Sequence, residues 1–180
     1  MLYSYQECIM KYQSDYQIMK AIEKGELFQL EKGIYSDKEY ASDIEIFMKK
    51  YPNAIMTMNS AFYHYGLTDT IPEYSYLATE RDAAKIKDKR IKQKFIPKEI
   101  LEVGVMKEIQ VDYTINIYSK ERMLIELVRH KSKLPYDYYK EIIGNYRKLI
   151  YDLDIQEVEE IALLFPKSNK IMQILQDEVF

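Results

Sequence analysis

The sequence predicts an α+β fold, and two features of the chain lead to this expectation. Residues 1–40 have the pattern of two short helices and a hairpin, and strand-like segments with further short helices follow over residues 41–118. After Ser119 the rest of the chain has the periodicity of α-helices. We therefore expect a small N-terminal domain over residues 1–40 and a mixed α/β domain over residues 41–180 that ends in a helical bundle.

Two short helices are expected at the start of the chain. The stretch LYSYQECIMKY indicates a first helix with Leu2, Ile9 and Met10 turned inward. The residues QSD interrupt this helix. Ser14 is a favourable N-cap for a second helix over residues 15–24, because its hydroxyl can accept a hydrogen bond from the backbone.

The second helix has one apolar and one polar face. Its apolar stripe consists of Ile18, Ala21 and Ile22, and its open face carries Gln17, Lys20 and Lys24. A helix that reads DNA would contact base edges through the residues of its first turn, here Ser14, Tyr16 and Gln17. Lys20 would then lie near a phosphate. Any amphipathic surface helix shows similar polar residues, so this pattern alone does not decide the function.

Two of the five glycines of the chain, Gly25 and Gly33, follow this helix. Gly25 is expected to end the helix in a left-handed conformation, and Gly33 to form the turn between the strand-like stretches LFQL and IYS. Lys32 at this turn would offer a further phosphate contact. The order of helix, helix and glycine-tipped hairpin is the outline of a winged helix-turn-helix, although a helix leading into any two-stranded ribbon fits this stretch nearly as well.

The middle of the chain is expected to alternate between short helices and strands. A capped helix is predicted from Ser42 to Tyr51, a buried strand in AIMTM, and a short helix from the cap Asn59 to Gly66. Strands are predicted in EYSYLAT and near residues 93–96, the latter after a basic loop or short helix, and a hairpin in VMKEIQVDYTINIY. The alternating residues of that hairpin are Val111, Tyr113, Ile115 and Ile117. Four helical segments then follow, interrupted at Pro135 and Pro166.

Charge is distributed unevenly along the chain. The net charge is −3, but residues 81–98 carry eight basic and two acidic side chains, and residues 119–150 carry eight basic and four acidic ones. In contrast, residues 1–40 have a net charge of −2 and residues 151–180 a net charge of −5. Such segregation sets a local electric field that suits an anionic partner, although basic patches also occur on proteins that have none.

Few residues suggest catalysis or metal binding. His64 and His130 do not have a metal-ligand spacing, and no phosphate-binding glycine loop or nucleophile elbow is present. Asp112 followed by YSKE fits a nuclease pattern only loosely, since Ser119 with Glu121 is better explained as a helix cap. We therefore expect no enzyme activity, no catalytic residues, no cofactor and no metal.

The cysteine count and the hydropathy of the sequence indicate in which cellular compartment the protein is expected. Cys8 is the only cysteine, which excludes a disulfide or a thiolate metal site within one chain. No apolar run has the length of a membrane span, and the polar N-terminus is unlike a secretory signal. We expect a cytoplasmic protein without a membrane partner.

Several stretches of the chain resemble the AbiEi family of antitoxins. The most specific are SAFYHYGLTD at residues 60–69 and IYSKERMLIELVRH at residues 117–130. KGELFQLEKGIYSD at residues 24–37 precedes them, and the match runs in order over nearly the full chain. The first helix of the winged domain is shortened or absent here in comparison with the family pattern.

The resemblance implies a small winged helix-turn-helix joined to an antitoxin domain. The family acts in type IV toxin–antitoxin systems of abortive infection, a form of phage defence, against a nucleotidyltransferase-like toxin. It also represses its own operon by reading inverted repeats in the promoter. The implied partners are therefore double-stranded promoter DNA, bound cooperatively by monomers, and the cognate toxin. A protein-interaction antitoxin without operator binding is the alternative, and a nuclease-like enzyme is a weaker one.

The resemblance makes the helix over residues 15–24 the recognition helix and the hairpin at Gly33 the wing. Because residues 1–40 are acidic, we expect the basic residues elsewhere in the chain to supply the contacts to the DNA backbone. The complete set of residues expected to contact DNA is Ser14, Tyr16, Gln17, Lys20, Lys24, Lys32, Lys85, Lys87, Lys89, Arg90, Lys92, Lys94, Arg122 and Arg129.

Overall fold

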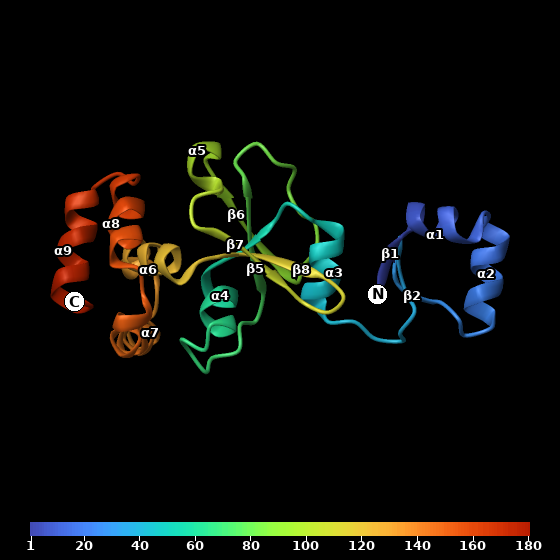
Figure 1. Cartoon of the computed structure of the whole chain (residues 1–180), viewed down its shortest axis with the longest axis horizontal. Helices are drawn as coiled ribbons and strands as arrows, with labels where there is room; N and C mark the ends of the chain where they lie inside the picture. Colours follow the sequence, from blue (N-terminus) through green and yellow to red (C-terminus); the bar gives the residue numbers. More distant parts are fainter. The chain divides into compact units, whose positions relative to one another are not determined.

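The computed structural model describes residues Met1–Phe180 and has a mixed α/β architecture with two separate sheets, which confirms the α+β expectation (Figure 1). The chain forms two compact units. The first contains Met1–Ala54 with Lys107–Asn116, and the second contains Ile55–Met106 with Ile117–Phe180. The domain boundary expected at residue 40 falls inside the first unit, before a helix that belongs to that unit.

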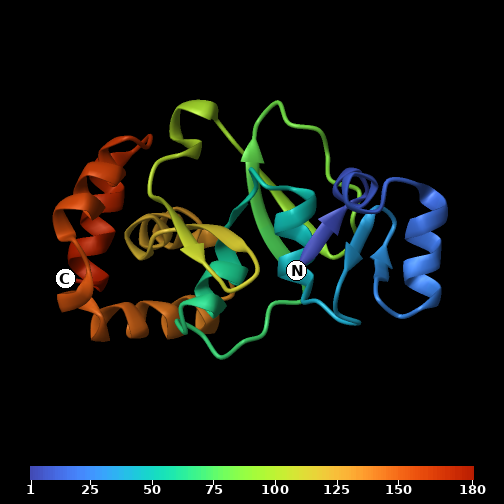
Figure 2. The ribbon, with the colours of Figure 1, turned by 45° about the vertical axis from the view of Figure 1, so that its right-hand side comes forward.

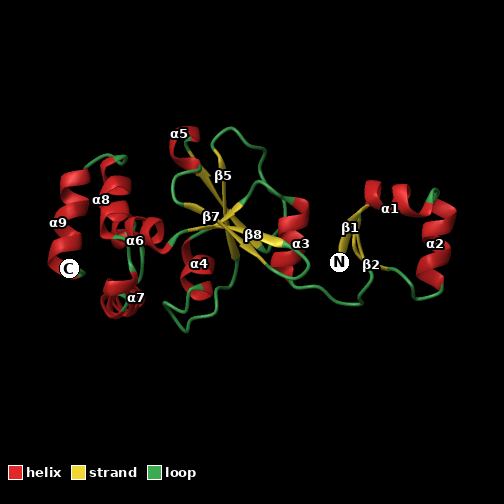
Figure 3. Ribbon diagram, viewed as in Figure 1, coloured by secondary structure: helices red, strands yellow, loops and turns green.

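The first unit begins with a strand, two helices and a hairpin (Figure 3). In chain order these elements are β1 (Leu2–Ser4), α1 (Tyr5–Tyr12), α2 (Asp15–Glu23), β2 (Phe28–Glu31) and β3 (Ile34–Ser36). The three strands form an antiparallel sheet in the order β1-β3-β2, so β1 at the start of the chain closes onto the hairpin. Helix α3 (Asp43–Lys50) follows, with Ser42 as its N-cap as predicted.

Serine caps determine where the first two helices begin. The hydroxyl of Ser4 accepts a hydrogen bond from the Glu7 backbone N–H, and the Glu7 carboxylate accepts one from the Ser4 N–H, a capping box that starts α1 at Tyr5. The hydroxyl of Ser14 accepts the Gln17 N–H at 3.3 Å and starts α2, as predicted. Between the helices the chain reverses at Gln13, which has a left-handed φ of 69°.

The expected start and inward face of the first helix are wrong in two respects. Leu2 lies in β1 and not in a helix, although it is buried as expected. Met10 is 74% exposed, whereas Cys8 is fully buried. Two residues along a helix are about 200° apart, so once Cys8 faces the core, Met10 faces solvent.

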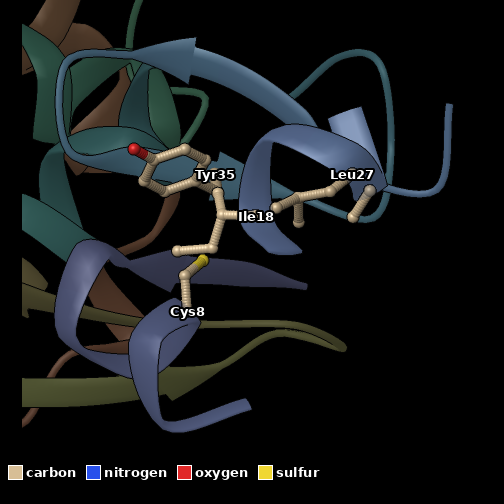
Figure 4. Close-up of a cluster of buried hydrophobic side chains, with 5 residues drawn as sticks. Cys8, Ile18, Leu27 and Tyr35 are labelled. Carbon is tan, nitrogen blue, oxygen red and sulfur yellow. The ribbon is translucent and has the colours of Figure 1, made fainter. Parts of the chain in front are cut away.

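A small hydrophobic core holds this part of the first unit together. Cys8 of α1, Ile18 of α2, Leu27 of the connection and Tyr35 of β3 converge in it (Figure 4). Ala21 completes the cluster, and Ile22 packs against it while partly buried. The predicted apolar stripe of α2 therefore faces the core. Burial raises the pKa of the Cys8 thiol, as expected for a core residue and not for a reactive one.

Both glycines after α2 have the left-handed conformation that the sequence predicts. Gly25 has a φ of +71° and ends α2, and Gly33 has a φ of +79° at the tip of the β2–β3 hairpin. A side chain is rarely compatible with these backbone angles, which explains why glycine occupies them.

The second sheet has five strands in the order β6-β5-β4-β8-β7. The strands are β4 (Ile55–Met56), β5 (Ser75–Glu80), β6 (Ile91–Ile96), β7 (Val105–Ile109) and β8 (Thr114–Tyr118). Strand β4 is antiparallel to β5 and parallel to β8, and β5 is parallel to β6. The structure therefore contains the predicted strands and the predicted hairpin, which is formed by β7 and β8.

Parallel pairing of β5 and β6 explains the loop before β6. The chain must return the full length of a six-residue strand between two parallel neighbours, and residues 81–90 make this return without a helix. An extended segment of this length reaches about 33 Å, which is enough to span β5. The basic run predicted as a loop or short helix is thus a crossover connection followed by an edge strand.

Two detailed expectations for this region are wrong. Helix α4 (Met58–His64) has Thr57 at its N-cap and not Asn59, and no side chain caps it. Instead, Ser60 of α4 accepts the backbone N–H of Tyr76 at 2.8 Å, which fixes the helix to β5. Val111 is fully exposed because it lies in the turn of the β7–β8 hairpin, whereas Ile115 and Ile117 are buried as predicted.

The C-terminal part of the second unit is helical, as predicted. Its elements are α6 (Lys120–Arg129), α7 (Tyr136–Lys148), α8 (Ile155–Leu163) and α9 (Ser168–Glu178), with short 3₁₀ turns at Lys131–Lys133 and Ile150–Asp152. A further short helix that the sequence analysis did not predict, α5 (Lys98–Leu101), lies between β6 and β7. Helix α6 is central, since it contacts α4, α8 and α9, and its residues 122–128 are all buried. Helices α8 and α9, coloured orange to red, pack together (Figure 2). None of the helices has both the length and the apolar character needed to cross a membrane.

Candidate nucleic-acid interface

Helix α2 and its two capping residues carry side chains expected to contact DNA, and most of these side chains lie in solvent. Tyr16 is 71% exposed, and Gln17, Lys20 and Lys24 are also exposed. Gln17, Lys20 and Lys24 are spaced by three and four residues, so they share one face of the helix, while Ile18 and Ala21 are buried. Ser14 differs from the others because it is half-buried and its hydroxyl caps the helix.

Two features of α2 were not anticipated from the sequence. Met19 is 55% exposed beside Lys20, so the open face of the helix is partly apolar. Lys24 lies 4.0 Å from the carboxylate of Glu26, an exposed contact that offsets part of its charge. The helix therefore presents hydrogen-bonding and apolar groups more than it presents positive charge.

The hairpin tip adds one exposed cation to the first unit. Lys32 lies directly before Gly33 in the β2–β3 turn. The neighbouring Glu31 forms an ion pair with Lys50 of α3 at 2.9 Å, so the carboxylate nearest in sequence to Lys32 is neutralised by another residue. Lys32 remains available for a phosphate contact of the kind that a wing makes.

The basic connection in the second unit carries three exposed lysines, Lys85, Lys87 and Lys89. Arg90 behaves differently, because its guanidinium donates to Asp88 from Nε at 3.0 Å and from Nη2 at 2.7 Å. This two-pronged ion pair fixes the arginine and neutralises much of its charge. Of this group, the lysines are the better candidates for contacts to phosphate.

The two lysines of β6 have different surroundings. Lys92 is exposed, and its ammonium lies 4.2 Å from the centre of the Tyr74 ring. Lys94 is half-buried and lines a cavity in the second unit. Of the two apolar residues at Ile91 and Phe95 in this edge strand, Ile91 is buried and Phe95 is 46% exposed.

Arg122 does not contact DNA, and this expectation is wrong. Its side chain is fully buried in α6, where it donates to Glu126 and to the backbone carbonyls of Ile100 and Val103. The sequence shows only that charged residues recur along this helix, whereas the fold places Arg122 in the core. Arg129, at the C-terminal end of the same helix, has a side chain that is 29% exposed and donates to Glu126.

His64 and Asp112 are placed in ordinary structural environments. His64 ends α4 and packs edge-on against Tyr65, with ring centres 5.6 Å apart. The carboxylate of Asp112 accepts a hydrogen bond from Lys38 at 2.6 Å, and this contact lowers its pKa. No three His, Cys, Asp or Glu residues lie together in a way that could hold a metal ion.

Comparison with known proteins shows a shared fold. No family model matches the sequence, and no curated protein matches it. Among solved structures, the RV2827C protein from Mycobacterium tuberculosis is similar, with a TM-score of 0.69 at 12% sequence identity. The alignment covers 99% of this chain and 72% of that one. At this level of identity the likeness concerns the fold alone.

Proposed function

We propose that this protein is a DNA-binding antitoxin that represses its own operon, with a winged helix-turn-helix at its N-terminus. The element order supports this proposal, since α1, a two-residue turn, α2 and a glycine-tipped hairpin follow one another over 32 residues, Tyr5–Ser36. In a winged helix-turn-helix the second helix enters the major groove and the hairpin contacts the adjacent backbone.

One observation carries the proposal, namely the uncovered polar face of α2. The helix is capped by Ser14, anchored in the core by Ile18, and exposes Gln17 and Lys20 one turn apart. A rigid helix with its hydrogen-bonding side chains in solvent is the geometry that base recognition requires. The antitoxin role and the nucleotidyltransferase-like toxin rest on the resemblance to the AbiEi family.

The acidic character of the first 40 residues favours a second candidate. Their net charge of −2 gives little non-specific attraction to DNA, and a protein-interaction antitoxin without operator binding would need none. A nuclease receives less support, because the Asp112 carboxylate is engaged by Lys38.

Binding of the full chain to the DNA upstream of its own gene tests the proposal. Fluorescence anisotropy should show tighter binding to this DNA than to a shuffled sequence of the same composition. The proposal also predicts a nucleotidyltransferase-like gene beside the gene of this protein, and co-expression of this protein should restore the growth of cells that express that toxin. Growth rescue without a preference for the upstream DNA would favour the protein-interaction antitoxin, and the absence of both effects would reject the antitoxin role.

A further inference from the structure

A cavity of about 340 Å³ in the second unit gathers basic side chains from three elements. Arg81 directly follows β5, Lys94 belongs to β6, and Arg129 and His130 lie at the end of α6. The backbone N–H of Arg81 donates to the Ile96 carbonyl at 2.8 Å, which holds the ends of the two parallel strands together. Ligands of open α/β sheets commonly bind at such carboxyl ends.

The acidic residues that line this cavity do not neutralise all of its positive charge. Glu126 is the only acidic residue that lines it, and its side chain is 4% exposed. Its carboxylate already accepts hydrogen bonds from Arg122 at 2.9 Å and from Arg129 at 2.9 and 3.0 Å. Two arginines therefore compensate this carboxylate, and Arg81 and Lys94 have no carboxylate partner.

Arg129 is held in a fixed orientation with unused donors. Its guanidinium lies 3.9 Å from the centre of the Phe165 ring, and its Nη1 donates to both oxygens of Glu126. The N–H groups of Nη2 and Nε have no partner in the structure, and these are the donors with which an arginine binds an oxyanion. Stacking and the ion pair thus pre-orient the guanidinium at little further entropic cost.

The pKa of His130 depends on the charges inside the cavity. Its Nδ1 lies 2.9 Å from the Glu126 backbone carbonyl, so this nitrogen carries the proton and donates. Burial lowers the pKa of His130, and the charges of Arg129 and Lys94 lower it further, against the opposing effect of Glu126. The imidazole is therefore neutral near pH 7, and two cations lie close enough to influence it.

The backbone beside the cavity is strained at one point. Met58, which also lines the cavity, has a φ of +46°, an uncommon conformation for a residue with a side chain. Residues held in such conformations are concentrated at functional sites. Met58 also begins α4, so the cavity adjoins the end of another helix.

We propose that this cavity binds a terminal phosphate group, with Lys94 and Arg129 as its principal ligands and Arg81 at its exposed side. A terminal phosphate presents three oxygens from one atom and can enter a concave site, whereas an internal phosphodiester is flanked by sugars on both sides. The ligand is a free nucleotide or the 5′-phosphorylated end of a nucleic-acid strand. Phe95, which is 46% exposed, lines the same cavity and provides aromatic surface for a base. This site is separate from base reading by α2.

Histidine ring resonances in the full-length protein can test this site directly, because His130 lies in the cavity and His64, the only other histidine, does not. The ligands are inorganic phosphate, AMP, ATP, and a short oligonucleotide with either a 5′-phosphate or a 5′-hydroxyl. We expect a saturable shift of the His130 signals with the phosphorylated ligands, no shift of the His64 signals, and no response to the 5′-hydroxyl oligonucleotide. Tighter binding of AMP or ATP identifies a free nucleotide, and tighter binding of the 5′-phosphorylated strand identifies a strand end.

Two neighbouring lysines on β6 provide a matched pair of variants. Lys94→Gln should weaken binding about tenfold, the loss of one charge-assisted contact. Lys92→Gln, two residues away with its ammonium over Tyr74, should bind like the parent. Neither lysine forms an ion pair, so both variants should fold. The proposal is overturned if no phosphorylated ligand shifts the His130 signals at about 10 mM, or if the two substitutions weaken binding equally.

Discussion

Arg122 and Glu126 lie one turn apart in α6 and form an ion pair in which both side chains are buried. Arg122 Nη2 is 2.9 Å from Glu126 Oε1, and Arg122 Nη1 donates to the carbonyls of Ile100 at 2.9 Å and Val103 at 3.0 Å. The guanidinium also packs against the rings of Tyr118 and Phe165. One side chain thus connects the central helix to the segment between α5 and β7.

Arg122→Ala should destabilise the second unit by about 3–5 kcal/mol, because it removes one partner of a buried ion pair and leaves two carbonyls without a donor. Urea denaturation followed by circular dichroism measures this change. Lys133→Ala, at an exposed position just after the same helix, should have almost no effect. Equal stability of the two variants would mean that Arg122 is not buried as described.

Alanine substitutions at Gly104 and Gly25 distinguish the cost of backbone strain from the cost of steric crowding. Their φ angles are +70° and +71°, but a Cβ at Gly104 would lie 2.7 Å from Arg122 Cβ, whereas a Cβ at Gly25 would contact nothing. Gly25→Ala should cost about 1 kcal/mol from the backbone angle alone. Gly104→Ala should cost clearly more, since a neighbour must also move. Thermal or urea unfolding gives both values, and a smaller cost at Gly104 would contradict the packing around Arg122.

Glu7 should make the first unit sensitive to acid. Hydrogen bonds from Lys49 and from the Ser4 backbone lower the Glu7 pKa from 4.5 to about 2. Because the folded-state pKa is the lower one, the stabilisation is present above pH 4.5 and is lost as the pH falls toward 2. Glu7→Gln keeps a capping acceptor but not the charge, so its stability should approach that of the parent as the pH falls through this range. A stability difference that does not change with pH would contradict this assignment. Glu39→Gln, at an exposed position, is the control.

The basic connection before β6 should contribute affinity for DNA without sequence preference. Replacing Lys85, Lys87 and Lys89 by Gln should weaken binding to upstream and shuffled DNA alike. Each lost phosphate contact should reduce the slope of log K against log salt concentration by about 0.9. Titrations at several salt concentrations give this slope. An unchanged slope would show that these three lysines do not contact DNA phosphates.

Helix caps and turn glycines could be predicted from the sequence because they depend only on residues close by in the chain. Ser14 and Ser42 start helices by accepting a backbone hydrogen bond three residues ahead, and Gly25 and Gly33 occupy the left-handed angles that their turns require. The short strand β1 was missed because its pairing with β3 joins residues 30 to 34 positions apart in the chain.

One part of the candidate site was also predictable, because it depends only on residues close by in the chain. The exposed face of α2 follows from helical periodicity around Ile18 and Ala21. The burial of Arg122 does not follow from its neighbours in sequence, since it depends on contacts with Ile100, Val103 and Phe165, which lie elsewhere in the chain. The cavity also depends on parallel pairing that brings Arg81 near Lys94, and no spacing in the sequence indicates it.

The most direct test of the central claim is the ratio of affinities of the full-length protein for upstream and shuffled DNA, measured by fluorescence anisotropy. Gln17→Ala combined with Lys20→Ala removes two exposed side chains from the open face of α2 and leaves its cap and its core residues in place. We expect this ratio to fall by about tenfold in the double variant, because Gln17 is expected to contact a base edge, an interaction worth about 1–3 kcal/mol, while the loss of the phosphate contact of Lys20 weakens binding to both DNAs. A control with Lys133→Ala and Lys148→Ala, also exposed, should keep the parent ratio. An unchanged ratio in the α2 variant would contradict the assignment of α2 as the helix that reads DNA.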